Sequence, residues 1–302
     1  EASSAHAQTA RVQYRFGNWM AELAWVLWRA EQCGQCGPPT VSLVGAMMGE
    51  ASGLFANLFG LPNTIDFSDA RCAPDISCAN VSNPNPREAS FPPLDVTKRL
   101  FYQRLVPMLK PWYLLEPLMA QHGREDALVI HLRGSDILDR QDLDYLPPPC
   151  KFYVHVIENG YMGGPFRNIT MVIDSPDHPC IGYVKSGHPE VVIQHQTTEL
   201  DMLTLMSAQN IALSTSSTFG LAGMLLSPHK SVNTFLPTYW DPKWHLCCDG
   251  QYSEARHSEL CRIGPASAVY QMVPPSLGYV TRRKDWIATT KHFDGFKHHG
   301  CH

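Results

Sequence analysis

A histidine, an arginine and an aspartate close an apolar run near the middle of the chain, in the segment His131-Leu132-Arg133-Gly134-Ser135-Asp136. A guanidinium presents permanently charged, forked donors that match the oxygens of a phosphate. Apolar residues that end this abruptly are typical of a buried parallel strand, and ligands bind at the carboxyl edge of such sheets. The segment therefore predicts a phosphate site, with His131 on the same strand face as Arg133. The alternative is a strand end at which Arg133 and Asp136 pair only with each other.

Hydroxyl side chains are concentrated in a second segment, Ser214-Thr215-Ser216-Ser217-Thr218-Phe219-Gly220, which precedes an apolar run of helical character. Hydroxyls and N–H groups at a helix start bind anions, whereas a simple helix cap needs only one Ser or Thr. The length of the run favours a phosphate site over capping. Upstream, Glu199 and Asp201 begin another predicted helix. They either complement the helix dipole or supply a carboxylate that accepts from the N–H groups of guanine.

Three other groups of residues have the types of metal ligands. Asp142-Leu143-Asp144 has the form of a manganese–diphosphate motif, but it stands in a polar loop rather than at the end of a rigid strand, which favours a solvated turn. Cys33-Gly34-Gln35-Cys36 lacks the second pair that a zinc site needs. The histidine-rich segment 292–302 is interpreted as an exposed tail without a specific ligand.

Short apolar strands alternate with helices from Asp126 to Pro237, and this pattern predicts a doubly wound parallel sheet. We expect strands at 127–132, 168–174, 191–194, 211–214 and 232–236, with helices at 151–158, around 183, at 199–208 and at 219–226.

The first part of the chain predicts a looser α/β unit. We expect strands at 11–14 and 40–44, a buried helix at 19–30, and helices within 96–119 that are interrupted at Pro107 and Pro111. Between them, 61–93 is interpreted as a long irregular segment, with Cys72 and Cys78 as a candidate disulfide. The predicted domains are 1–125, 126–237 and a cysteine- and histidine-rich extension at 238–302.

Composition limits the class of protein. The net charge of the 302 residues is −4 without a basic block, which argues against nucleic acid as a partner. No apolar run is long enough to span a membrane, although a longer form tethered to one stays open. Ten cysteines and two glycosylation sequons, at Asn80 and Asn168, predict a lumenal or extracellular location, and we expect the lumen of the Golgi or endoplasmic reticulum. The disulfide pairing stays open.

Three motifs, in order, resemble the fucosyltransferase superfamily, which includes α-1,2-fucosyltransferases and protein O-fucosyltransferases. The segment 131–136 looks like its His-x-Arg-x-x-Asp motif. Arg15-Phe16-Gly17-Asn18 is similar to its Gly-Arg-x-Gly-Asn-Gln signature, with Tyr14 and Trp19 replacing the outer Gly and Gln. In the third motif an Asp opens one helix and a Ser/Thr-Phe pair opens the next. Asp201 and Ser217-Thr218-Phe219 match it, and Ser216 stands where the α-1,2 branch usually has Asn.

The resemblance implies a GT-B fold: two Rossmann-like domains face each other across a cleft, and the second, a doubly wound parallel sheet, binds the nucleotide. It also implies GDP-fucose as donor, inversion at the anomeric carbon and no metal cofactor. By motif, Arg133 would hold the β-phosphate, with Ser216, Ser217, Thr218 and Phe219 around the same group. His131 and Asp201 would contact guanine or ribose, and Gly17 and Asn18 would face the transferred sugar and the acceptor hydroxyl. From the residue types, the candidates for the general base are Asp136, Asp139 and Glu199, and the alternative for Asp136 is a structural pairing with Arg133 or a backbone N–H.

These implications fit the residue types, because a departing diphosphate that no metal assists needs a guanidinium and oriented N–H dipoles. The expected function is transfer of fucose from GDP-fucose to a glycan hydroxyl. Transfer to Ser or Thr of a folded domain and the use of another GDP-sugar are alternatives. A lumenal glycan-binding protein without catalysis is the alternative from a different class.

Overall fold

The structure is a computed structural model, and it divides the chain into two compact units, Glu1–Trp112 and Tyr113–His302. It describes residues 9–11, 20, 23–24, 27, 40–44, 53–54, 57–59, 64–66, 94–134, 147–160, 165–214, 217–238, 268–271 and 297–300. None of the helices in this described part of the chain has the length and apolar character of a membrane span.

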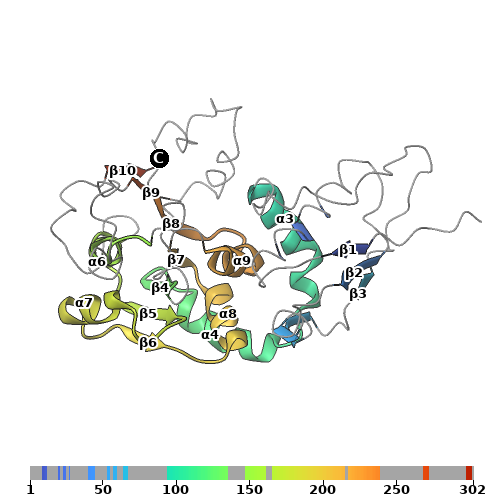
Figure 1. Ribbon diagram of the computed structural model, residues 1–302, viewed down its shortest axis with the longest axis horizontal. Helices are drawn as coiled ribbons and strands as arrows, with labels where there is room; N and C mark the ends of the chain where they lie inside the picture. The colour runs from blue at the N-terminus through green and yellow to red at the C-terminus, as the bar shows by residue number, and fades with distance from the viewer. Residues whose placement is uncertain are drawn as a thin grey trace, which may run out of the picture. The chain divides into compact units, whose positions relative to one another are not determined.

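The second unit is built on a sheet whose strand order is β10-β9-β8-β7-β4-β5-β6 (Figure 1). All neighbouring strands are parallel except β10, which runs antiparallel to β9. The strands are β4 (Ala127–Leu132), β5 (Asn168–Ile173), β6 (Val192–Gln194), β7 (Asn210–Ala212), β8 (Asn233–Thr238), β9 (Ala268–Gln271) and β10 (Lys297–Gly300).

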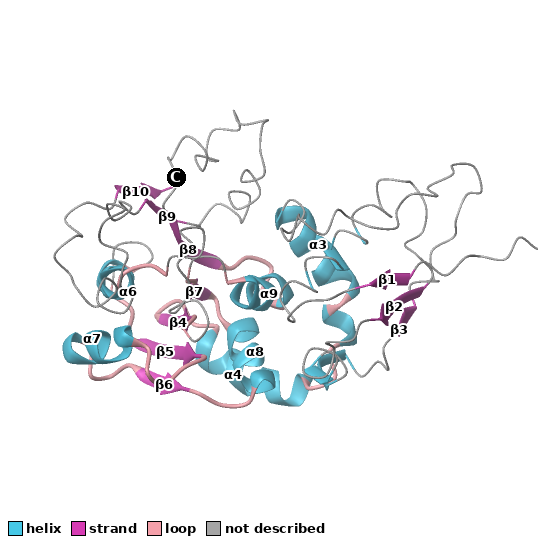
Figure 2. Ribbon diagram, in the orientation of Figure 1, coloured by secondary structure: helices cyan, strands magenta, loops and turns pink. Residues whose placement is uncertain are grey.

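Helices alternate with the strands between β4 and β8 (Figure 2). They are α6 (Cys150–Asn159), α7 (Pro179–Gly187), α8 (Thr198–Ser207) and α9 (Thr218–Leu226). The chain runs from β4 through β5 to β6, then returns along α8 to β7 on the other side of β4. The strand order therefore reverses between β4 and β7, and the carboxyl edge at such a switch point is where open α/β sheets bind ligands.

The core of this unit follows from the alternation of side chains along β4. All six residues of β4 are buried, as expected of a central parallel strand with helices on both faces. Leu128, Ile130 and Leu132 belong to the core that α6 and α7 complete, with Phe152 and Val184 among its members. The intervening residues of β4 face the opposite side, on which α8 and α9 pack against each other.

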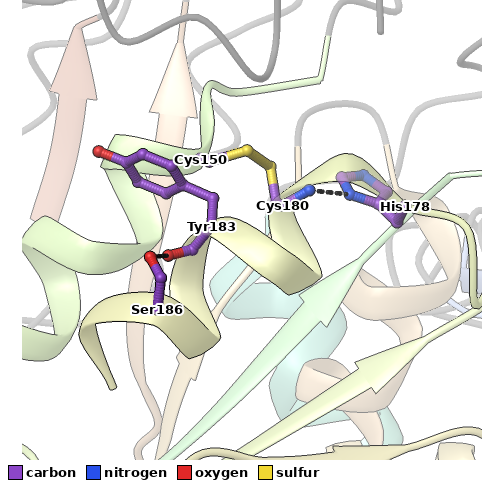
Figure 3. The surroundings of a disulfide bond; sticks show 5 residues. All are labelled: Cys150, His178, Cys180, Tyr183 and Ser186. Atoms are coloured by element: carbon purple, nitrogen blue, oxygen red, sulfur yellow. Dashed lines mark hydrogen bonds between the residues drawn. A yellow bond between two sulfur atoms is a disulfide. The ribbon is translucent and has the colours of Figure 1, made fainter. Parts of the chain in front are cut away.

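A disulfide between Cys150 and Cys180 joins the amino-terminal ends of α6 and α7 (Figure 3). The two cysteines are 30 residues apart in sequence, and each is fully buried. The bond closes a loop that contains the whole of β5.

The predicted doubly wound parallel sheet is confirmed, and the expected strands and helices between 126 and 237 are present with ends that differ by one or two residues. The structure adds β9 and β10 to the same sheet, although the sequence gives 268–271 and 297–300 no clear strand pattern.

The first unit contains a three-stranded sheet in the order β1-β2-β3, formed by Thr9–Arg11, Thr40–Val44 and Thr64–Asp66. The pair β1–β2 is parallel and β2–β3 is antiparallel. The expectation of an irregular segment at 61–93 is wrong at β3, because its residues Thr64 and Ile65 are β-branched and suit the pairing with β2. The candidate disulfide between Cys72 and Cys78 lies outside the described residues.

Helices of the first half follow the prolines and the apolar spacing. Helix α3 (Leu94–Arg104) and the 3₁₀ turn η1 (Val106–Met108) precede α4 (Trp112–His122), with Pro107 inside the turn and Pro111 just before α4. The expected helix at 19–30 is helical at its described positions, Met20, Leu23, Ala24 and Leu27, and all four are buried. That spacing is one face of a helix.

Candidate functional site

Arg133 and Gly134 form the turn that follows β4 at the switch point, and both neighbouring strands hold this turn. The backbone N–H of Arg133 donates to Ser214 Oγ, just beyond β7, at 3.2 Å. The backbone N–H of Gly134 donates to Asp174 Oδ1, just beyond β5, at 2.5 Å. Arg133 itself is partly exposed. The turn is therefore fixed in position, while its cationic residue remains accessible at the edge of the sheet.

The turn needs glycine at 134 because other groups approach its backbone closely. A Cβ there would lie 3.0 Å from His178 Cδ2 and 3.1 Å from Asp174 Oδ1. His178 is itself fixed, because its Nδ1 accepts from the backbone N–H of Cys180 at 3.2 Å and so caps α7 (Figure 3). The disulfide partner Cys180 and the turn after β4 are thus linked through one buried histidine.

The side chain of His131, on β4, packs against the first turn of α9. It is 4% exposed, and its ring centroid lies 5.8 Å from that of Phe219. A Cβ on Gly220 would lie 3.0 Å from His131 Nδ1, so glycine lets the start of α9 press against the strand. Burial lowers the pKa of His131 to about 3, with Arg133 and His178 acting in the same direction. At neutral pH the ring is therefore uncharged, and it adds no positive charge to that of Arg133.

Ser217 immediately precedes helix α9, and its side chain is almost fully buried. Ser217 Oγ accepts from the backbone N–H of Gly220 at 3.2 Å and is thus the N-cap of the helix. The N–H groups of the first turn, at Thr218 and Phe219, are directed toward the start of the helix, where the macrodipole favours negative charge. The cap does not exclude an anion site, because the Ser217 hydroxyl occupies one N–H group and the dipole of the helix still favours negative charge at its start.

Asp201 lies in the first turn of α8, which follows β6 at the same edge of the sheet. It is 8% exposed, and Gln194 Nε2 donates to its Oδ1 at 2.9 Å. Burial raises the pKa of the Asp201 carboxyl, whereas the bonds from Gln194 and the backbone N–H of Gln196, together with His195, oppose that rise. Glu199 lies in the same turn, so the dipole interaction expected for both acids is present.

The structure brings His131, Arg133, Ser217, Thr218 and Phe219 together through the pairing of β4 with β7 and the packing of α9 on β4. Four predicted site residues lie outside the described residues, namely Gly17, Asn18, Asp136 and Ser216. The same is true of Asn80 and of the alternatives at Asp139 and 142–144.

Sequence reasoning missed Asp174, Gln194 and Gly220 as residues of this edge. The signal for Asp174 was present, since an apolar run that ends in a charged residue is the pattern that singled out Arg133. Gln194 and Gly220 act through contacts with other elements, and their types alone give no such signal.

Chemically, this edge combines one guanidinium, one helix amino terminus and buried uncharged side chains. Charges that face an anion in a low-dielectric setting act more strongly than in water. Within the described ranges, no three His, Cys, Asp or Glu residues are grouped as metal ligands. The edge is thus suited to hold a phosphate or diphosphate at the switch point.

Searches against known proteins gave matches among solved structures alone, since no family model and no curated protein matches the chain. The fucosyltransferase NodZ from Bradyrhizobium matches over 72% of this chain and 92% of its own, at 16% identity and a TM-score of 0.41. NodZ α-1,6-fucosyltransferase soaked with GDP-fucose matches over 73% and 92%, at 15% identity and a TM-score of 0.39. POFUT1 in complex with GDP matches over 51% and 52%, at 10% identity and a TM-score of 0.32. These neighbours belong to the superfamily that the motifs resemble, and at these TM-scores the likeness assigns no role to any residue of this chain.

Proposed function

We propose that the chain is a glycosyltransferase that moves fucose from GDP-fucose to a hydroxyl group of a glycan. The observation that carries the proposal is the turn at Arg133, which Ser214 and Asp174 hold at the switch point. A guanidinium fixed in this way, with the start of α9 packed on the same strand, is suited to the negative charge of a diphosphate.

The reaction breaks the bond between the anomeric carbon and the β-phosphate oxygen, and the electron pair leaves with GDP. Arg133 and the N–H groups at the start of α9 stabilise the charge that develops on the leaving group. The acceptor oxygen forms the new bond from the opposite face and gives its proton to a carboxylate, for which Asp136, Asp139 and Glu199 are the candidates. The product then has the opposite anomeric configuration. Because the guanidinium and the helix supply the positive charge, the reaction needs no divalent metal.

The proposal includes the other donor contacts that the motifs imply. His131 and Asp201 would contact guanine or ribose, Ser216 would join Ser217 near the phosphate, and Gly17 with Asn18 would face the fucose and the acceptor. The fold that we propose for this reaction is of the GT-B type, with the nucleotide bound by the doubly wound sheet of the second unit.

The decisive experiment follows release of GDP from GDP-fucose, with and without EDTA and with an array of acceptors. We expect GDP release that EDTA leaves unchanged and that a glycan acceptor accelerates. If folded small domains accelerate it and glycans do not, the alternative of protein O-fucosylation at Ser or Thr replaces the proposal. Faster turnover of another GDP-sugar would identify a different donor. Glycan binding without any GDP release would favour the lectin alternative, and stabilisation by UDP with manganese alone would refute the GDP site.

We also propose that the chain resides in the Golgi or endoplasmic reticulum lumen and bears an N-linked glycan at Asn168. The buried disulfide supports an oxidising compartment. Asn168 is exposed at the amino end of β5, and its Nδ2 donates to Asp126 at 3.0 Å. Thr170 of the sequon is buried, so the modification would precede folding. Asn168→Gln should remove one glycan from the protein expressed in a eukaryotic host, and an unchanged electrophoretic mobility would refute the site.

A further inference from the structure

The last residue of β6 holds the carboxylate at the start of α8 in a network with fixed proton positions. Gln194 Nε2 donates to Asp201 Oδ1 and to Thr204 Oγ1, each at 2.9 Å. Thr204 Oγ1 in turn donates to the carbonyl of Leu200 at 2.9 Å. Both amide protons and the hydroxyl proton are therefore used. If the Gln194 amide were rotated by half a turn, its oxygen would face Asp201 Oδ1 and Thr204 Oγ1, which both accept in this network. The network therefore fixes the orientation of the amide.

Asp201 keeps the capacity to accept from a ligand. A carboxylate accepts about four hydrogen bonds, and the donors from Gln194 and the backbone of Gln196 account for two. The residue is 8% exposed and stands at the carboxyl edge of the sheet, where the nucleotide is proposed to bind. Guanine presents two adjacent donors, its ring N–H and its amino group, whereas hypoxanthine has only the ring N–H. A carboxylate held in one orientation can distinguish the two bases.

We propose that Gln194 is a positioning residue that sets the base specificity of the nucleotide site by fixing the orientation of Asp201. This inference rests on the proposed function, because it concerns the nucleotide of the same donor. Without the amide of Gln194, the Asp201 carboxylate loses the donor that fixes Oδ1 and rotates about its side chain. The Asp201 carboxylate then accepts a hydrogen bond from one N–H group of guanine, but it no longer accepts from both N–H groups at the same time. The expected result is lost discrimination rather than lost binding.

The test compares dissociation constants for GDP and IDP, measured by titration calorimetry on the full chain. Wild type should bind GDP at least about tenfold more tightly than IDP, the difference that one hydrogen bond to a charged group supplies. Gln194→Leu should reduce this ratio of dissociation constants to about twofold or less, chiefly because GDP binds more weakly. The matched control is Gln209→Leu. Gln209 stands just before β7, and the substitution removes the hydrogen bond from its Nε2 to the carbonyl of Ser231. It should leave the ratio unchanged.

A second variant keeps the inference testable if Gln194→Leu does not fold. Thr204→Val removes one acceptor of the Gln194 amide at nearly constant volume, and it should give a ratio between those of wild type and Gln194→Leu. Equal weakening of GDP and IDP, with the wild-type ratio retained, would show that Gln194 is merely structural and would overturn the inference. A wild-type protein that binds neither nucleotide would instead refute the proposed function itself.

Discussion

Three glycines of the second unit permit a graded test of how α9 is packed, because an added methyl group meets different neighbours at each. At Gly220 a Cβ would lie 2.8 Å from Leu213 Cδ2 and 3.0 Å from His131 Nδ1. At Gly223 it would lie 2.6 Å from Leu205 Cβ, which is fixed to the backbone of α8. At Gly182, in the exposed part of α7, it would meet nothing within 4 Å.

The expected changes in the free energy of unfolding follow from these distances. Gly182→Ala should stabilise the protein by up to about 1 kcal/mol, because alanine is the better helix former. Gly220→Ala gains the same propensity but overpacks the contact with β4 at a cost of about 1–3 kcal/mol, so we expect a net loss of about 1 kcal/mol. Gly223→Ala should lose roughly 2 kcal/mol, because relief requires α8 and α9 to separate.

Urea unfolding checks the order, and calorimetric titration with GDP checks its functional consequence. Gly220→Ala should weaken GDP binding by up to about tenfold, because relief of the overlap moves the amino terminus of α9 away from the edge of the sheet. Gly182→Ala, the matched control, should bind GDP as wild type does. If Gly220→Ala is as stable as Gly182→Ala and binds GDP normally, α9 does not pack on His131 as described.

Two further predictions concern the stability of the second unit. Replacing Cys150 and Cys180 with alanine should lower the free energy of unfolding by about 3–4 kcal/mol, given the loop that the bond closes, and an unchanged urea midpoint would contradict this. Burial lowers the pKa of His122 and His178 to about 4 and that of His131 to about 3, below the unfolded value of 6.5. Since the unfolded chain binds the protons first, stability should be complete above pH 6.5 and fall by about 1.4 kcal/mol per histidine per pH unit down to about pH 4. Unfolding free energies between pH 7 and 5 measure the slope, His131→Gln should reduce it by about a third, and a flat profile would refute the burial of these rings.

The elements around Arg133 could be predicted from the sequence because their signals are local. The apolar run of β4 ends in polar residues, and the hydroxyl at Ser217 starts a helix, so each feature is visible within a few residues. Asp174 ends an apolar strand as Arg133 does, but its bond to Gly134 depends on which strand lies beside it, and the role of Gln194 likewise depends on the neighbouring helix α8. Loop ends that meet across a sheet leave no trace in local composition.

The disulfide and the outer strands were missed for a related reason. Cys150 and Cys180 meet because α6 and α7 lie side by side, and ten cysteines offer too many pairings for spacing alone to choose one. Strand β9 joins the sheet by pairing with β8 across a separation of about thirty residues, which a local pattern cannot report.

The central claim is that Arg133 binds the β-phosphate of the leaving group, and a cycle of two ligands against two proteins tests it most directly. The dissociation constants of GDP and GMP are measured for wild type and for Arg133→Ala. We predict that wild type prefers GDP by about ten- to a hundredfold, and that Arg133→Ala loses most of this preference while GMP binds almost as before. A preference for GDP that is unchanged in Arg133→Ala would contradict the claim.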